Sequence, residues 1–297
     1  MKKIILATLV ALSFASCKKS SDETPAPSTT PTDTTTNNTG AIGAVPSSFT
    51  QKVLVEMFTS ASFGACPDGL TKLDQTVASN SEKIIPTCIH DADGMQLPQT
   101  FTYTTTFGVS AYPSGMVNRT PSLGNVMLQP SQFLSNSTTA LAKAAKCGLA
   151  INSTLSGTTA SIEVDAGFTT TLSGTYNLTV FLTEDEVTGT GSTFDQKNNY
   201  NTTSGSPYYN LGNPIVGFKH NYVVRKVLSS AAMGDAIDVS KIVAQGVFKK
   251  TFTVDVSSYN SAKLYVVAFV NKIGTSASTH EVMNVQKAKI NSLKNWD

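Results

Sequence analysis

Apolar and polar residues alternate along several segments of the second half of the chain, and this pattern restricts the fold more than any other feature. The alternation is clearest at residues 161–166, 176–183 and 247–256. A period of two places every second side chain on one face of a β-strand. Further strands are expected at 147–155, 220–228, 263–272 and 281–290. About seven strands in this block predict an all-β, immunoglobulin-like sandwich over residues 148–297.

The block before it, residues 48–147, mixes two periodicities. Strands are predicted at three short apolar segments, which are 53–58, 83–90 and 115–119. Helices are predicted after Pro67, weakly over 98–107, and over 130–146. Strands that alternate with helices are typical of α/β domains, so two domains of different class are expected.

The segment VLVEMFTSASFGACPDGL, residues 53–70, has the layout of a thioredoxin-like active site, with a strand, a turn, and a helix that opens with Cys-Pro. Thiol–disulfide exchange there needs the spacing Cys-x-x-Cys, in which the first thiolate is stabilised by the helix N-terminus. Cys66, followed by Pro67, matches the second position, whereas Phe63 occupies the first. The nucleophilic thiol is missing, so the sequence predicts a protein that is not an enzyme.

Tyr112-Pro113 lies where a thioredoxin-like fold carries a cis-proline beside the active site, and a cis bond is expected from that likeness. Two alternatives remain open for the remaining thiol. Cys66 could react alone at the start of the helix, or it could be a buried thiol that only packs; the loss of the first position favours packing.

The N-terminus has the pattern of an export signal. Lys2 and Lys3 precede an apolar run over residues 4–15, and small residues stand directly before Cys17. We interpret residues 1–16 as a lipoprotein signal peptide and Cys17 as the lipid attachment site, the alternative being an ordinary secreted protein with a chance cysteine. The Ser-, Thr- and Pro-rich residues 17–47 then form a disordered tether.

Charge and cysteine content exclude several classes of protein. Two of the 22 Lys and Arg residues lie in the signal, which leaves 20 basic against 20 acidic residues and no basic footprint for nucleic acid. Three cysteines remain besides Cys17, too few for a disulfide-stapled scaffold. Cys66 and Cys88 could pair only if their Cα atoms lie within about 7 Å.

Neither metal ions nor cofactors are predicted. Residues 90–94 (HDADG) and 184–186 (EDE) contain metal-ligand types, but the acidic spacing of a calcium loop is absent and polar turns are the simpler interpretation. His220 and Arg225 are expected on opposite faces of one strand, because they lie an odd number of positions apart, and they are therefore not expected to form one site.

Five segments in order resemble the Omp28-type lipoproteins of Bacteroidetes: VLVEMFTS…CP, TCIHDAD, AYPSGMVNR, LTVFLTEDEV and HNYVVR. The resemblance implies a thioredoxin-like domain followed by a β-sandwich, anchored at the outer membrane, with suggested adhesin or receptor roles. Many members carry Trp-Cys-x-x-Cys-Pro at the site. This chain departs from that pattern at Ser62 and Phe63.

The long Gly-, Asn- and Ser-rich segment 188–214 is the candidate binding loop, because Tyr200, Tyr208 and Tyr209 are side chains that make adaptable contacts. The sequence thus predicts a non-catalytic envelope lipoprotein, held to the membrane by its lipid, that binds a protein, peptide or glycan. The alternatives are an envelope thiol–disulfide oxidoreductase or a degenerate relative of one, and a structural part of a larger outer-membrane assembly.

Overall fold

The computed structural model of the chain describes residues 40–297. The predicted signal peptide, the lipid attachment site Cys17 and most of the predicted tether lie outside these residues. Within the described part, no helix combines the length and the apolar character needed to cross a membrane.

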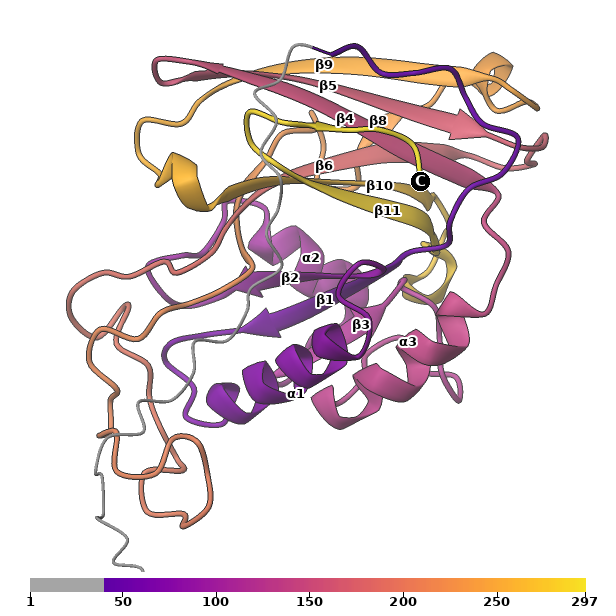
Figure 1. The fold of residues 1–297 in the computed structure, drawn as a ribbon. Coiled ribbons are helices and arrows are strands. Elements are labelled where there is room, and N and C mark those ends of the chain that lie inside the picture. Colours follow the sequence, from indigo (N-terminus) through magenta and orange to yellow (C-terminus); the bar gives the residue numbers. More distant parts are fainter. Residues whose placement is uncertain (1–39) are drawn as a thin grey trace, which may run out of the picture. The chain divides into compact units, whose positions relative to one another are not determined.

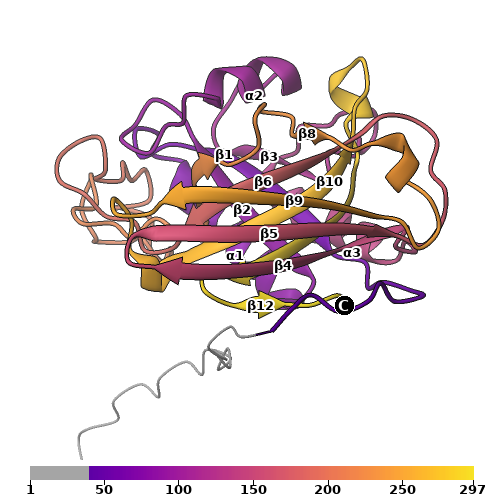
Figure 2. The same ribbon diagram turned by 90° about the horizontal axis from the view of Figure 1, so that it is seen from above.

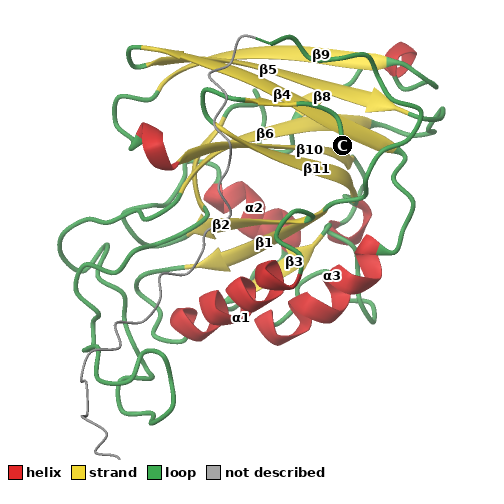
Figure 3. Cartoon of the chain, in the orientation of Figure 1, coloured by secondary structure: helices red, strands yellow, loops and turns green. Residues whose placement is uncertain are grey.

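Two β-sheets form the body (Figures 1 and 3). The larger has eight strands in the order β11-β10-β6-β7-β2-β1-β3, with β8 paired to β6. Its strands are β1 (Val53–Thr59), β2 (Ile84–His90), β3 (Ser114–Val117), β6 (Tyr176–Glu184), β7 (Val223–Val227), β8 (Asp235–Ala236), β10 (Leu264–Lys272) and β11 (Val282–Lys289). The smaller has four strands in the order β12-β4-β5-β9, which are β4 (Cys147–Ser156), β5 (Thr159–Phe168), β9 (Val247–Asp255) and β12 (Leu293–Lys294).

The first half alternates strands and helices, as its two periodicities predict. β1 and β2 are parallel and are joined by α1 (Cys66–Ser79), while β3 runs antiparallel to β1. Every residue of β1 and β2 is buried, because α1 and α3 (Phe133–Leu141) pack on one face and α2 (Thr100–Phe107) packs on the other. Figure 1 shows this layering.

The expected helix over 130–146 is shorter than predicted. A 3-10 turn, η1 (Pro130–Gln132), leads into α3, which ends at Leu141. Short 3-10 turns also occur before β9, β10 and β11, as η2 (Val239–Lys241), η3 (Ser261–Lys263) and η4 (Ala277–Thr279).

All seven strands predicted for the second half are present, and they form two layers (Figure 2). The alternating apolar side chains of β4, β5 and β9 face those of β6 and β10 across one buried core. The second half is therefore largely β-structure in two packed sheets.

The two halves of the chain share one β-sheet, although the sequence predicts a domain boundary between residues 147 and 148. β7 lies next to β2, where Val223 is paired with Cys88, and β6 and β10 continue the same sheet. The predicted division follows the change of periodicity, which carries no information about which strands become neighbours. A single sheet consequently crosses the predicted boundary.

The prediction of a disordered tether is wrong for residues 40–47, the part of the tether that the structure describes. Residues 40–47 lie on the folded body: the carbonyls of Gly40, Gly43 and Pro46 accept hydrogen bonds from Asn152, Trp296 and Gln245. These contacts are made by main-chain oxygens, so the polar composition that predicts disorder does not reveal them.

Candidate functional site

The turn between β1 and α1, residues 60–65, holds the thioredoxin-like sequence feature. The amide of Phe63 donates to the carbonyl of Ser60, and the amide of Cys66 donates to the carbonyl of Phe63. Cys66 begins α1, and Pro67 follows in the first turn, where a helix has no partner for an amide. The two positions of the Cys-x-x-Cys spacing differ in exposure: Phe63 is 42% exposed, whereas Cys66 is 0% exposed.

The Cys66 thiol is free and poorly suited to form a thiolate. Burial raises its pKa, and hydrogen bonds from Thr59 and Ser60 oppose that shift only in part. All three cysteines in residues 40–297, Cys66, Cys88 and Cys147, are free and buried. The pairing of Cys66 with Cys88 that spacing left open is therefore not formed.

Tyr112 and Pro113 lie against this turn. The Tyr112–Pro113 bond is cis, as the resemblance implies. The rings of Phe63 and Tyr112 are 5.1 Å apart, and the Tyr112 hydroxyl donates to Asp91. A Cβ on Gly69 would lie 2.6 Å from Cγ of Pro113, so a glycine lets α1 pack on the proline. The structure thus brings Phe63, Cys66, Pro67, Tyr112 and Pro113 together.

The long connection between β6 and β7 crosses the same turn. We name residues 188–219 the strap; they contain neither helix nor strand, and Figure 1 shows them beside the start of α1. Val187 and His220 exchange two backbone hydrogen bonds, of 2.8 and 2.9 Å, and so close the base of the strap.

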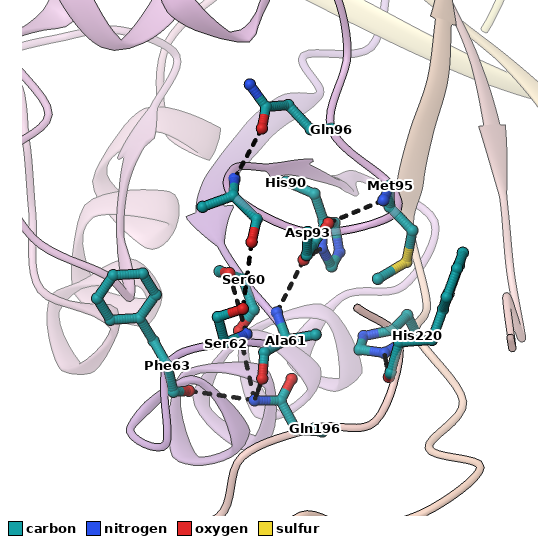
Figure 4. Close-up of polar contacts among 12 residues, drawn as sticks. Ser60, Ala61, Ser62, Phe63, His90, Asp93, Met95, Gln96, Gln196 and His220 are labelled. Atoms are coloured by element: carbon teal, nitrogen blue, oxygen red, sulfur yellow. Dashed lines mark hydrogen bonds and ion pairs between the residues drawn. The ribbon is translucent and has the colours of Figure 1, made fainter. Parts of the chain in front are cut away.

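Main-chain amides of the strap and the side chain of Gln196 bind the carbonyls of the turn, and Figure 4 shows the contact of Gln196. The amide of Lys197 donates to Ala61 O at 2.8 Å, and that of Asn199 donates to Gly64 O at 3.0 Å. The side-chain amide of Gln196 donates to the carbonyls of Phe63 at 3.1 Å and of Ser60 and Ala61 at 3.3 Å. Sequence reasoning missed this contact entirely.

The three tyrosines predicted as binding residues have different surroundings. The Tyr208 hydroxyl lies 3.0 Å from Thr71 Oγ1 and its ring packs near Phe218, so Tyr208 attaches the strap to α1. Tyr200 is half-buried, whereas Tyr209 is 43% exposed. The expectation of three adaptable aromatic side chains therefore fits Tyr209 better than Tyr208.

Two histidines and one aspartate form a buried cluster behind the turn (Figure 4). Oδ2 of Asp93 lies 2.6 Å from His90 Nδ1 and accepts the amide of Ala61 at 2.8 Å. Burial acts to raise the pKa of Asp93, but the interactions with His90 and the hydrogen bonds from the amides of Ala61 and Met95 together lower that pKa. The imidazole of His220 stands edge-on to that of His90 at 5.3 Å, and its Nε2 bonds to Phe194 O at 2.8 Å. This cluster thus contacts both the turn and the strap.

His220 and Arg225 do not share one strand. His220 precedes β7 and pairs with Val187, whereas Arg225, within β7, lies 3.2 Å from Glu184. The expectation that both residues lie in one strand is therefore wrong, because β7 begins at Val223. Among residues 40–297, no group of three or more His, Cys, Asp or Glu side chains is arranged to hold a metal ion.

The fold and the turn place the chain among proteins with two packed β-sheets and few helices, and sequence comparison identifies the family. The family model for the outer membrane protein Omp28 matches residues 100–294, about two thirds of the chain. The chain belongs to this Omp28 family, which confirms the resemblance and associates the protein with the outer membrane.

Comparison with solved structures supports the fold through HBP35. HBP35 of Porphyromonas gingivalis aligns with a TM-score of 0.67 at 18% identity, over 82% of this chain and 76% of its own. Protein AGR_C_4864 from Agrobacterium tumefaciens aligns with a TM-score of 0.48 at 12% identity, over 85% of this chain and 97% of its own. Among curated proteins, none matches the sequence.

Proposed function

We propose that this protein is a lipoprotein, anchored through Cys17, that binds a protein, peptide or glycan partner at the cell envelope without catalysing a reaction. Its first half is thioredoxin-like in our interpretation, since Cys66 opens the helix after β1 and cis-Pro113 lies beside that helix. The observation that carries the proposal is the exposed ring of Phe63, which stands where the reactive thiol of a redox site would stand.

An aromatic contact surface replaces a nucleophile at this site. The Phe63 ring packs on Tyr112, and Tyr112 is fixed through its hydroxyl to Asp91. A rigid aromatic pair with an exposed edge has the properties of residues that dominate binding energy in interfaces, because it offers a large apolar area at little entropic cost.

Removal of the Phe63 ring should therefore weaken partner capture. In a pull-down from envelope extracts with the mature, detergent-solubilised protein, we expect the partner to bind Phe63→Ala at least tenfold more weakly than the wild type. Phe101→Ala is the matched control, because Phe101 is 76% exposed on α2 and lies outside the turn. Equal retention of the partner by wild type and Phe63→Ala would contradict the proposal.

The oxidoreductase alternative has one observation in its favour, the free Cys66 thiol at a helix start beside Pro113. Against it, burial raises the pKa of that thiol, and only thiolates attack disulfides. We expect insulin reduction by the wild type to equal that of Cys66→Ser. Turnover that disappears in Cys66→Ser would establish the redox function instead.

A further inference from the structure

Several carbonyls of the turn accept hydrogen bonds, and the donors of these bonds come from the strap. Residues 197 and 199 donate their amides to residues 61 and 64. Donation by every second residue is how an extended chain presents its N–H groups to a neighbour. The strap therefore binds its own protein as an extended peptide would.

Gln196 adds a side-chain component to this contact. Its amide nitrogen faces the carbonyls of Ser60, Ala61 and Phe63, which fixes the orientation of the amide group. Gln196 is fully buried where the strap meets the turn. Gly64 allows this close approach, because a Cβ at that position would lie 2.1 Å from Oδ1 of Asn199.

Elsewhere the strap is attached by the Phe194 ring, by Phe218 against the core of the first half, and by single polar contacts. The Phe194 ring fits between Gly94 and Gly189, where added Cβ atoms would lie 2.5 and 2.3 Å from it. His220 bonds to the carbonyl of Phe194, and Tyr208 to Thr71. These contacts join the strap to the body one by one rather than through a continuous strand ladder, so the strap should open at a lower free-energy cost than the two sheets.

We propose that the strap is an autoinhibitory cover: residues 196–199 occupy, as a tethered peptide, a site on the turn 60–64 that an extended polypeptide partner takes when the strap lifts. This inference rests on the proposed function and narrows its partner to a polypeptide with N–H donors and a side-chain amide. A tethered segment competes at an effective concentration in the millimolar range for short flexible linkers, so weakening it makes the site available.

The three buried cysteines provide the test, because Cys66 lies beneath the turn while Cys88 and Cys147 lie in the cores of the body. We expect Gln196→Ala to raise the rate of Cys66 alkylation by iodoacetamide about tenfold in the native protein, as followed by mass spectrometry of each cysteine. The rates at Cys88 and Cys147 should not change. Equal acceleration at all three would mean general unfolding and would overturn the proposal.

A second variant tests the same contact from the opposite side. Gly64→Ala places a methyl group against Asn199 and should also accelerate alkylation of Cys66 alone. Thr202→Ala is the matched control, since Thr202 is an exposed strap residue outside the contact. Acceleration by Thr202→Ala as large as that by Gln196→Ala would show that the 196–199 contact is not what closes the cover.

The peptide chemistry is tested in trans. The probe is a synthetic heptapeptide with the sequence of residues 194–200, Phe-Asp-Gln-Lys-Asn-Asn-Tyr, added at millimolar concentration to Gln196→Ala. We expect it to restore slow alkylation of Cys66, while the same peptide with alanine in place of glutamine does not. No protection by either peptide would overturn the polypeptide site. Partner capture through Phe63 uses none of these readouts, so the two proposals fail separately.

Discussion

Replacement of Arg119 by methionine should lower the free energy of unfolding by about 3 to 5 kcal/mol. The guanidinium makes two hydrogen bonds of 2.7 Å to the Glu56 carboxylate, and both side chains are buried. Its carbon Cζ also lies 4.9 and 5.0 Å from the ring centroids of Phe107 and Phe269. Arg119→Met leaves the Glu56 carboxylate buried without its partner, and that uncompensated charge is the source of the cost.

Urea unfolding of wild type and variant would measure this loss. The double variant Glu56→Leu with Arg119→Met should recover most of it, because no charge is then left in the core. The surface pair of Lys249 and Glu163, at 2.8 Å, is the control, and Glu163→Gln should cost at most about 1 kcal/mol. A loss for Arg119→Met no larger than for Glu163→Gln would show that the buried pair is not a stability determinant.

The elements of this fold were predictable from periodicity, but their assembly was not. Alternation located β5, β6 and β9 because successive side chains of a strand point to opposite faces, one of which packs on an apolar core. Nothing local states that β7 runs beside β2, since a strand carries no mark of its neighbour. An acidic residue at position 56 within an apolar strand was the one signal that a buried partner existed elsewhere, and it did not identify Arg119.

The candidate site, too, has one part that the sequence predicted and one part that it did not. Spacing alone placed Phe63 and Cys66 at the two redox positions, because the feature is local in sequence. The strap contact joins Gln196 to a turn more than 130 residues earlier through carbonyl oxygens, which every residue has. A glycine at position 64 is a sequence trace of this contact, but glycine also occurs in turns that no other segment approaches, so it does not identify the contact.

His220 should make the protein less stable in acid, through a different physical effect. Burial, and then the nearby His90, lower the pKa of His220 from 6.5 to about 4, while the hydrogen bond to the Phe194 carbonyl and the charge of Asp93 act in the opposite direction. The folded protein therefore binds this proton more weakly than the unfolded chain does. The His220 contribution is intact above pH 6.5, decreases as the pH falls below it, and is fully lost below about pH 4.

The size of the effect follows from the two pKa values. Between pH 7.5 and 4.5 this single group should remove about 2 to 3 kcal/mol from the free energy of unfolding. His220→Gln keeps a donor for Phe194 O but does not titrate. Between pH 7.5 and 4.5, the free energy of unfolding of this variant in urea should therefore fall by about 2 to 3 kcal/mol less than that of the wild type. Carboxylates that do not interact with His220 titrate alike in both proteins and cancel in the comparison, whereas Asp93 interacts with His220.

His280→Gln separates this effect from histidine titration in general, because burial lowers the pKa of His280 as well, but away from the strap. That variant should retain most of the wild-type acid sensitivity. If His220→Gln and the wild type lose the same stability between pH 7.5 and 4.5, the neutral imidazole at the base of the strap is not what makes the fold sensitive to acid. If His220→Gln alone resists acid, the attachment of the strap is the part of the molecule where protonation acts.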